Sequence, residues 1–222
     1  MSKDIGDEIR LLWKSAADFG IELTESELEM FSIYLDELWE WTQHINLIGL
    51  SSRERIVIEL FLDSLIPVPF FPKQGSMLDV GSGAGIPGFP VKIHRPSIKL
   101  HLLESNAKKV NFLKHVARLL NLKDITIHRG RIESQGSNLN SERFGIITAK
   151  AFGPLEQVIQ HCAPLLMQGG MLVSFLGAGA NRELRRAKHL MERYKLRVYK
   201  AVRYTLPGKL SERNTMLLKR EV

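Results

Sequence analysis

The 222-residue sequence predicts an α/β fold, with a mostly parallel, seven-stranded sheet flanked by helices and preceded by a helical extension. The first observation is a glycine-rich loop, residues 81–88, between a short apolar segment and a helix-like one. The second is the alternation of strand-like and helix-like segments after residue 75, which is typical of parallel sheets. The third is helical periodicity before residue 65. We therefore divide the chain into an N-terminal helical region, 1–64, and an α/β domain, 65–222.

The N-terminal region is predicted to hold three helices, at residues 4–19, 25–47 and 53–65. Thr24 and Glu27 have the spacing of a capping box, which marks the start of the second helix. Apolar side chains of that helix recur every three or four residues and share one face: Leu28, Phe31, Leu35, Leu38 and Trp39. Prolines and a glycine then end the helical region and lead to the sheet: Pro67, Pro69, Pro72 and Gly75.

The first strand of the sheet is predicted by Met77, Leu78 and Val80, which suit a strand buried on both faces. Pro87 sits where the next helix begins, because its fixed φ suits the first helical turn. Between them, four glycines let the backbone turn sharply and approach a ligand closely: Gly81, Gly83, Gly85 and Gly88. The segment therefore predicts a ligand-binding loop at the carboxyl end of the first strand.

The rest of the chain alternates between the two kinds of segment. We expect strands at residues 77–81, 99–104, 125–128, 145–149, 171–176, 196–203 and 214–219, and helices at 87–94, 107–120, 154–167 and 180–194. The last two strands have no helix between them, so the final strand is expected to be antiparallel. This arrangement is that of the class I methyltransferase sheet.

An acidic residue, Glu104, ends the second predicted strand, about 20 residues beyond the glycine loop. An acid at this distance accepts hydrogen bonds from ribose hydroxyls, so the pattern predicts a nucleoside cofactor. Gly83, Gly85 and Gly88 match the dinucleotide fingerprint, but Asp79 at the end of the first strand would repel a pyrophosphate. The same carboxylate would attract the ammonium of S-adenosylmethionine. That cofactor is favoured over a nicotinamide or flavin, and over glycines that serve only helix–sheet packing.

Charge is distributed unevenly along the chain. The net charge is +7, and residues 182–220 hold 13 Lys and Arg against three acids, whereas acids outnumber Lys and Arg in residues 1–64. A basic face of this kind suits a polyanion, and we favour nucleic acid over a merely solvated surface. The candidates for phosphate contacts are Arg182, Arg185, Arg186 and Arg213.

The sequence lacks membrane and disulfide signals. No uninterrupted apolar run reaches the ~18 residues that span a bilayer, and the first residues lack the layout of a signal peptide. Cys162 is the only cysteine, which excludes an internal disulfide, and its apolar surroundings predict a buried thiol. We expect a cytoplasmic monomer with no membrane partner and no metal ion.

The type of methyl acceptor is inferred by elimination. Residues 148–155, after the fourth predicted strand, lack the Pro-Pro-aromatic motif that holds an exocyclic amine. Cys162 lies inside a predicted helix, so it is poorly placed as the nucleophile that cytosine C-5 methylation needs. No Lys-Asp-Lys-Glu arrangement for a hydroxyl acceptor is evident. An endocyclic purine nitrogen fits best, because its lone pair is available and it loses no proton.

Several segments resemble the bacterial 16S rRNA guanine N-7 methyltransferase family, also called glucose-inhibited division protein B. They are DVGSGAGIPGFP at 79–90, LLESNAKKVNFLKHV from Leu102, AKAFGPL at 149–155, Ile45–Leu47 and Leu62–Ser64. The similarity covers nearly the whole chain. It implies a class I fold with a helical extension, S-adenosylmethionine as methyl donor, and one guanine of 16S rRNA as acceptor, in free RNA or in the assembled small subunit.

The resemblance also implies roles for individual residues. Glu104 would hold the ribose, and Arg131 and Lys150 would lie beside the cofactor and the incoming RNA as the catalytic residues. Ile132 and Glu133 would contact the adenine. The full set predicted for cofactor binding is Asp79, Gly81, Gly83, Gly85, Ile86, Glu104, Ile132, Glu133 and Lys150.

Three positions depart from the family pattern. Lys150 stands where the family usually has arginine, Leu176 where it has lysine, and Leu60 or Phe61 where it has histidine before the Leu-Asp-Ser segment. Lysine keeps the charge but loses the planar fork of arginine. Three alternatives therefore stay open: a methyltransferase for another RNA site or a small molecule, a cofactor- and RNA-binding relative with weakened catalysis, and an oxidoreductase, which Asp79 disfavours.

Overall fold

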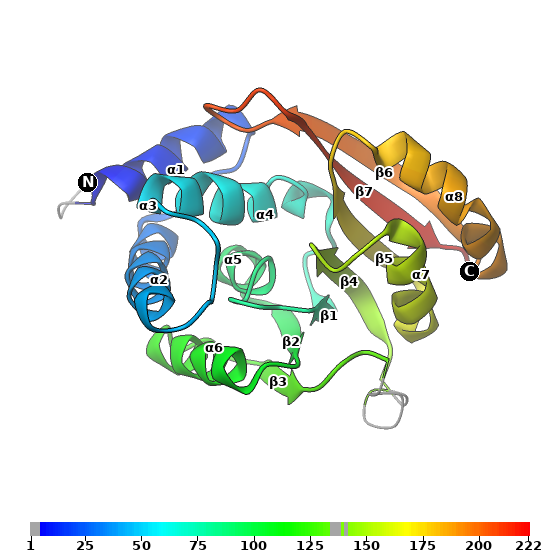
Figure 1. Cartoon of the computed structure of the whole chain (residues 1–222), viewed down its shortest axis with the longest axis horizontal. Coiled ribbons are helices and arrows are strands. Elements are labelled where there is room, and N and C mark those ends of the chain that lie inside the picture. Colours follow the sequence, from blue (N-terminus) through cyan, green and yellow to red (C-terminus); the bar gives the residue numbers. More distant parts are fainter. Residues whose placement is uncertain (1–4, 134–138, 140–141) are drawn as a thin grey trace.

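The computed structural model describes residues 5–133, 139 and 142–222. All seven predicted strands are present in one sheet, in the order β3-β2-β1-β4-β5-β7-β6 (Figure 1). Six of them run in the same direction, and the last strand, β7, is antiparallel to its neighbours β5 and β6, as predicted. Their bounds are β1 Gly75–Val80, β2 Ile98–Glu104, β3 Ile125–Arg129, β4 Phe144–Lys150, β5 Leu166–Leu176, β6 Leu196–Thr205 and β7 Glu212–Arg220.

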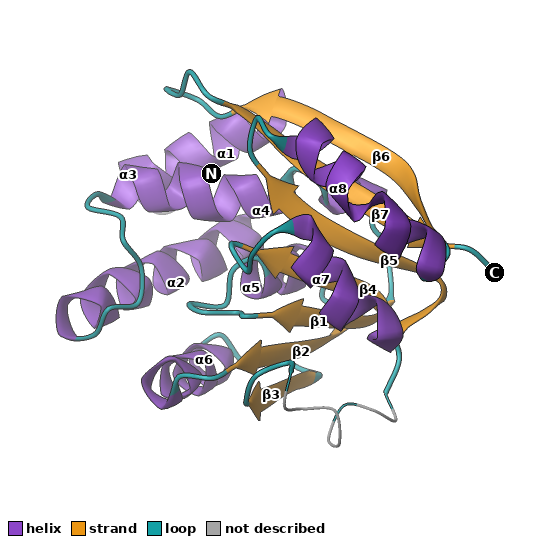
Figure 2. Cartoon of the chain, turned by 45° about the vertical axis from the view of Figure 1, so that its right-hand side comes forward, coloured by secondary structure: helices purple, strands orange, loops and turns teal. Residues whose placement is uncertain are grey.

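Alternating apolar side chains of the strands build a separate hydrophobic cluster on each face of the sheet. In β1, Met77 belongs to one cluster and Leu78 to the other, and Ile146 and Ile147 divide in the same way in β4. Helices α5 (Gly88–His94) and α6 (Ala107–Leu119) cover the first face, together with the N-terminal helices. Helices α7 (Leu155–Cys162) and α8 (Ala180–Arg193) cover the second (Figure 2).

The N-terminal helices form one continuous core with the sheet. Thr24 and Glu27 make the predicted capping box at the start of α2. The apolar residues of α2 pack in the same cluster as those of β1 and α5, so the cluster crosses the predicted boundary at residue 64. The helical elements are α1 Asp7–Asp18, α2 Glu25–His44, α3 Arg53–Ile56, the π-helix η1 Val57–Leu62, α4 Asp63–Leu65 and the 3₁₀ turn η2 Val68–Phe70.

The helix expected at 25–47 ends at His44, and three other elements differ more clearly from the prediction. The helix expected at 154–167 ends at Cys162, and a 3₁₀ turn, η4 (Ala163–Leu165), leads directly into β5. Pro164 explains the early end, because proline removes a helical hydrogen bond and clashes with the preceding turn. The strand expected at 171–176 therefore starts at Leu166, which pairs with Phe144 of β4. The other difference is that the helix expected at 53–65 has a π-helical middle.

Two further expectations concern the single cysteine and membrane-spanning segments. Cys162 is a free, fully buried thiol, as predicted, and burial raises its pKa to about 12. In the part of the chain that the structure describes, none of the helices is both long and apolar enough to cross a membrane.

Candidate active site

The glycine loop begins where β1 ends and turns over the carboxyl end of β2. The backbone N–H groups of Gly81 and Ser82 both donate to the carbonyl oxygen of Leu103, at 2.9 and 3.0 Å. Gly81 has φ +70°, a left-handed conformation that disfavours any residue with a Cβ. Gly88 packs differently: a Cβ there would lie 2.5 Å from Leu102 Cδ2, so glycine lets α5 approach β2 closely.

The carboxylate of Glu104 is fixed at the end of β2 by two backbone donors. Gly83 N donates to Oε2 at 2.9 Å, and Asn106 N donates to Oε1 at 2.7 Å. A carboxylate offers about four acceptor positions, so each oxygen keeps one for a ligand. The loop and the acid that the sequence analysis paired are thus connected directly.

A first pocket of about 300 Å³ opens above this carboxylate. Five of the predicted site residues line it: Gly81, Glu104, Arg131, Ile132 and Glu133. The other described residues that line it were not predicted as site residues: Val80, Leu103, Ser105, Gly130, Ala151, Phe152 and Gln157. The pocket combines a carboxylate that has open acceptor positions with apolar side chains such as Ile132 and Phe152, which suits a nucleoside.

The described residues that line this pocket do not include the other five predicted site residues: Asp79, Gly83, Gly85, Ile86 and Lys150. Gly83 acts on the pocket through its backbone N–H, which donates to the carboxylate of Glu104. Gly85 has φ +88°, and a Cβ there would lie 2.3 Å from the ring of Phe89. These residues shape the loop.

Asp79 lies beneath the loop, and its carboxylate is fully buried. Its Oδ1 accepts from Thr148 Oγ1 at 2.7 Å and its Oδ2 from Gly88 N at 3.2 Å. Burial raises the pKa of Asp79 to about 6, although these hydrogen bonds favour the ionised form. The carboxylate thereby fastens the start of α5 to β4. That it also faces the ammonium of the cofactor stays a prediction.

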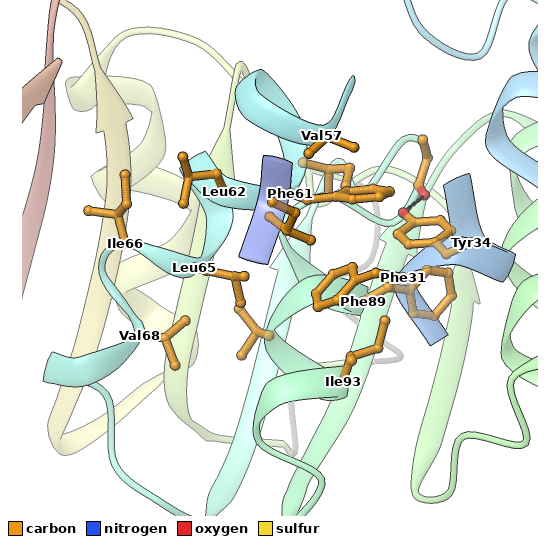
Figure 3. Close-up of a cluster of buried hydrophobic side chains, with 14 of the residues drawn as sticks. Phe31, Tyr34, Val57, Phe61, Leu62, Leu65, Ile66, Val68, Phe89 and Ile93 are labelled. Atoms are coloured by element: carbon orange, nitrogen blue, oxygen red, sulfur yellow. Dashed lines mark hydrogen bonds between the residues drawn. The ribbon is translucent and has the colours of Figure 1, made fainter. Parts of the chain in front are cut away.

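Helix α2 supports the loop from the N-terminal side. The hydroxyl of Tyr34 donates a 2.6 Å hydrogen bond to the carbonyl oxygen of Ala84. The tyrosine ring stacks on Phe61 at 4.9 Å between ring centres and meets Phe89 edge-on at 5.6 Å. Figure 3 shows Tyr34 in this aromatic cluster, with its hydroxyl on the dashed bond.

A second pocket of about 390 Å³ lies beside the first. Ala151 lines both pockets, so they meet just after the end of β4. The other lining residues of the second pocket are Asp63, Lys150, Phe175, Leu176, Gly177, Ala178, Tyr204, Ser211, Glu212 and Arg213. The structure therefore places Lys150 in a neighbouring pocket, at the junction with the predicted cofactor residues.

The ammonium group of Lys150 is held by the N-terminal helical segment. Its Nζ lies 2.7 Å from Asp63 Oδ2, donates to the carbonyl oxygen of Glu59 at 3.1 Å, and sits 5.3 Å from the ring centre of Phe175. Glu59 belongs to the π-helix, and such rare turns often occur at functional sites. Burial lowers the pKa of Lys150, and the charge of Asp63 opposes that shift.

Asp63 is the centre of this network and was missed as a site residue. Tyr204 donates its hydroxyl to Oδ1 at 2.8 Å, and Arg213 Nη1 lies 3.1 Å from Oδ2. A second carboxylate, that of Glu59, also binds Arg213, together with two further cations, Arg55 and Lys209. The signal for Asp63 was present, since a lone acid in the apolar stretch 60–71 is buried only when paired.

One cluster elsewhere has the side chains that bind metal ions. The ligand atoms of His101, His128 and Glu142 lie within 4.8 Å of one another. His101 Nδ1 is 3.1 Å from His128 Nε2 and 3.2 Å from Glu142 Oε2. Two imidazoles and a carboxylate suit a divalent transition metal, and they also suit a hydrogen-bonded chain. The cluster is separate from the residues that line the two pockets.

The predicted phosphate-binding arginines fall into two groups. Arg182, Arg185 and Arg186 are exposed on α8. Arg213 is part of the Asp63 network and is partly buried. The structure therefore leaves a basic surface on α8 and assigns Arg213 to the second pocket.

Comparison with known proteins identifies the family of the chain. The family model described as rRNA small subunit methyltransferase G matches residues 27–212. Two relatives called ribosomal RNA small subunit methyltransferase G, from Bacillus mycoides and Bacillus cereus, are 34% identical over 205 residues, covering 91% of this chain and 86% of the relative. The predicted resemblance is thereby confirmed.

Solved structures confirm the fold. A ribosomal protein L11 methylase from Lactobacillus delbrueckii subsp. bulgaricus has TM-score 0.59 at 12% identity, covering 79% of this chain and 82% of that one. Aeropyrum pernix fibrillarin with natively bound S-adenosyl-L-methionine has TM-score 0.51 at 15% identity, covering 66% and 68%. Both likenesses concern the fold alone. The family model and the relatives show that the chain belongs to the rRNA small subunit methyltransferase G family, whose members are S-adenosylmethionine-dependent methyltransferases, and its fold is the class I fold.

Proposed function

We propose that this chain transfers the methyl group of S-adenosylmethionine to N7 of a guanine in 16S rRNA, with the first pocket holding the cofactor and the second the guanine. The observation that carries this proposal is the junction of the two pockets at Ala151. Methyl transfer needs donor and acceptor in line and roughly 3–3.5 Å apart, which two adjoining pockets permit. The family match supports the reaction and the RNA.

The first pocket fits S-adenosylmethionine. Glu104 presents one open acceptor position on each oxygen, which suits the two hydroxyls of the ribose. Ile132 and Phe152 supply apolar walls for the adenine, and Gly81 lines the same pocket. When bound, S-adenosylmethionine supplies a methyl group on a positively charged sulfonium.

The residues of the second pocket act by positioning. N7 of guanine has a free lone pair and gives up no proton, so the chain needs no general base. The Lys150 ammonium can hold the neighbouring O6, while Asp63 fixes that ammonium in place. Only the methyl group moves, and the positive charge of the sulfonium passes to the base. Orientation and electrostatics are therefore the contributions of the protein.

We also propose that the exposed arginines of α8 hold the RNA backbone, and that the chain acts as a cytoplasmic monomer without a metal ion. Leu176, where the family usually has lysine, lines the second pocket and reduces its positive charge. The remaining cations there, Lys150 and Arg213, would carry the interaction with the acceptor.

Transfer by the purified chain tests the proposal. The chain is incubated with isotopically labelled S-adenosylmethionine and small-subunit rRNA or subunits, and the nucleosides are separated by mass spectrometry. We expect label in 7-methylguanosine and none with the Gly81→Val variant, whose β-branched side chain does not suit φ +70°. Label in another nucleoside, or no transfer with a cofactor-binding chain, would refute the proposal.

A further inference from the structure

The loop between β6 and β7, residues 206–211, borders the second pocket. Its last residue, Ser211, lines that pocket together with the residues that begin β7. The loop has a fixed shape, because Leu206 is buried in the core and its carbonyl oxygen accepts a 3.0 Å hydrogen bond from Lys209 N. Gly208 has φ +70°, which suits the third position of the turn that this bond closes. The side chains of the β6–β7 loop are therefore presented at defined positions beside the pocket.

Lys209 connects the β6–β7 loop to the N-terminal helices, over which the loop lies in Figure 1. Its Nζ lies 2.8 Å from Glu59 Oε1, and the same oxygen is 2.7 Å from Arg55 Nε. Glu59 and Asp63 bring two negative charges to this ion-pair network. Four cations pair with them: Arg55, Lys150, Lys209 and Arg213. The network thus holds more positive than negative charge. The side chains of Arg55 and Lys209 are 44% and 31% exposed, so an anionic ligand has access to that excess.

Leu210 follows Lys209 in the loop and is fully exposed. A single exposed leucine is common on protein surfaces, so its neighbourhood decides what it indicates. Here the apolar side chain stands between a group of cations and Ser211, which lines the pocket proposed to hold the guanine. A nucleic acid strand offers the complementary chemistry, with phosphates for the cations and the faces of bases for the leucine.

We infer that the β6–β7 loop holds the RNA strand at the target guanine, with Arg55 and Lys209 on a phosphate and Leu210 in the space that the guanine leaves in the base stack; this rests on the proposed N7 methyl transfer. A base bound in a pocket is no longer stacked on its neighbours, and unstacking costs free energy. An apolar side chain in the gap offsets part of that cost, because it covers base faces that water would otherwise contact. The phosphate neutralises the excess of positive charge.

The role of Leu210 is tested with rRNA in which both nucleotides next to the methylated guanine are made abasic. On unmodified rRNA, Leu210→Ala should lower the single-turnover rate at saturating RNA about 5-fold or more, because the unstacked guanine is less populated. On the abasic rRNA there is less stacking to break, so the parent and Leu210→Ala should differ by less than about 2-fold. Leu119→Ala, at another exposed leucine, on α6, should match the parent on both RNAs. An equal loss on the two RNAs, or no loss on either, would overturn the role of Leu210.

The role of the two cations is tested through RNA affinity. The double variant Arg55→Gln, Lys209→Gln should bind rRNA severalfold more weakly, and its log–log salt slope should fall by about 0.7, the share of one phosphate contact on a single strand. Lys123→Gln, at an exposed lysine, should leave the slope unchanged. A parental slope in the folded double variant would overturn the phosphate contact.

Controls separate these outcomes from a structural effect and from the proposed function. Leu210→Met and Lys209→Arg keep the apolar surface and the charge, so both should behave as the parent. Every variant should bind S-adenosylhomocysteine with parental affinity, because the first pocket is lined by other described residues. A parent chain that forms no 7-methylguanosine would overturn the proposed function, whereas a parent that forms it at the same rate as Leu210→Ala would overturn this inference alone.

Discussion

The hydroxyl of Tyr34 in helix α2 donates a 2.6 Å hydrogen bond to the carbonyl oxygen of Ala84, in the middle of the glycine loop. Tyr34 is fully buried, and its ring contacts Phe61 and Phe89 on either side of the bond. The N-terminal helices therefore hold the loop as well as covering the sheet. An extension of this kind connects the stability of the helical region to the shape of the first pocket.

Removal of this hydrogen bond should weaken cofactor binding. In Tyr34→Phe the buried carbonyl of Ala84 loses its donor, which costs about 1–3 kcal/mol. We expect a lower melting temperature and a severalfold weaker affinity for S-adenosylhomocysteine by calorimetry. Tyr199→Phe is the matched control, because Tyr199 is 53% exposed. If Tyr34→Phe lost stability but kept full affinity, the hydrogen bond would serve the core and not the loop.

Glu104→Gln should weaken cofactor binding by about 1–3 kcal/mol, the range for hydrogen bonds to a charged group. Glutamine replaces one acceptor oxygen with a donor that faces the backbone N–H of Gly83 or Asn106. Both the ribose contact and the loop geometry are affected. Glu192→Gln on α8 provides a surface control. A change of only a few tenths of a kcal/mol, with the fold intact, would mean that Glu104 does not contact the ligand.

Lys150→Ala should reduce single-turnover methylation at least ~10-fold, or about 1.4 kcal/mol of barrier. The variant leaves Asp63 with Tyr204 and Arg213, so the carboxylate stays paired and the chain should remain folded. Lys150→Arg should retain or raise the rate, since it restores a planar donor fork. Lys123→Ala, on an exposed lysine, should behave as the parent. Parental turnover in a folded Lys150→Ala chain would remove Lys150 from the acceptor site.

RNA affinity should fall steeply with salt. If Arg182, Arg185 and Arg186 contact phosphates, each neutralising change should reduce the log–log slope by about 0.7–0.9. Arg213 should behave differently, because it is already paired with Asp63 and Glu59. Arg118→Gln, exposed on α6 on the opposite face of the sheet, should leave the slope unchanged. Equal slopes for the parent and the triple α8 variant would show a solvated surface with no RNA contacts.

Local signals in the sequence predicted most of the fold. The strand that contains Asp79, the glycines and Glu104 are consecutive features of one βαβ unit, so spacing alone places them together. The signal for the start of α2 was equally local, because the two residues of the capping box, Thr24 and Glu27, lie three positions apart. The end of α7 was missed because the effect of Pro164 outweighed an apolar pattern that continues to residue 167.

The second pocket could not be predicted in this way because its residues come from distant parts of the chain. Asp63 and Lys150 are 87 positions apart, and Tyr204 reaches Asp63 across 141 positions. The spacing of residues along the sequence does not indicate contacts between such distant positions. The sequence places Asp79 near the end of β1, but it does not give the direction of the side chain, which the structure shows through the bonds to Thr148 and Gly88. The contact of Asp79 with the cofactor stays a prediction.

The central claim is that this chain methylates N7 of one guanine in 16S rRNA. The most direct measurement is mass spectrometric mapping of methylated guanines in small-subunit rRNA from cells with the gene, without it, and complemented with either the parent or Lys150→Ala. We predict one 7-methylguanosine that disappears without the gene, returns with the parent and stays low with Lys150→Ala. An identical set of methylated guanines in all four strains would contradict the claim.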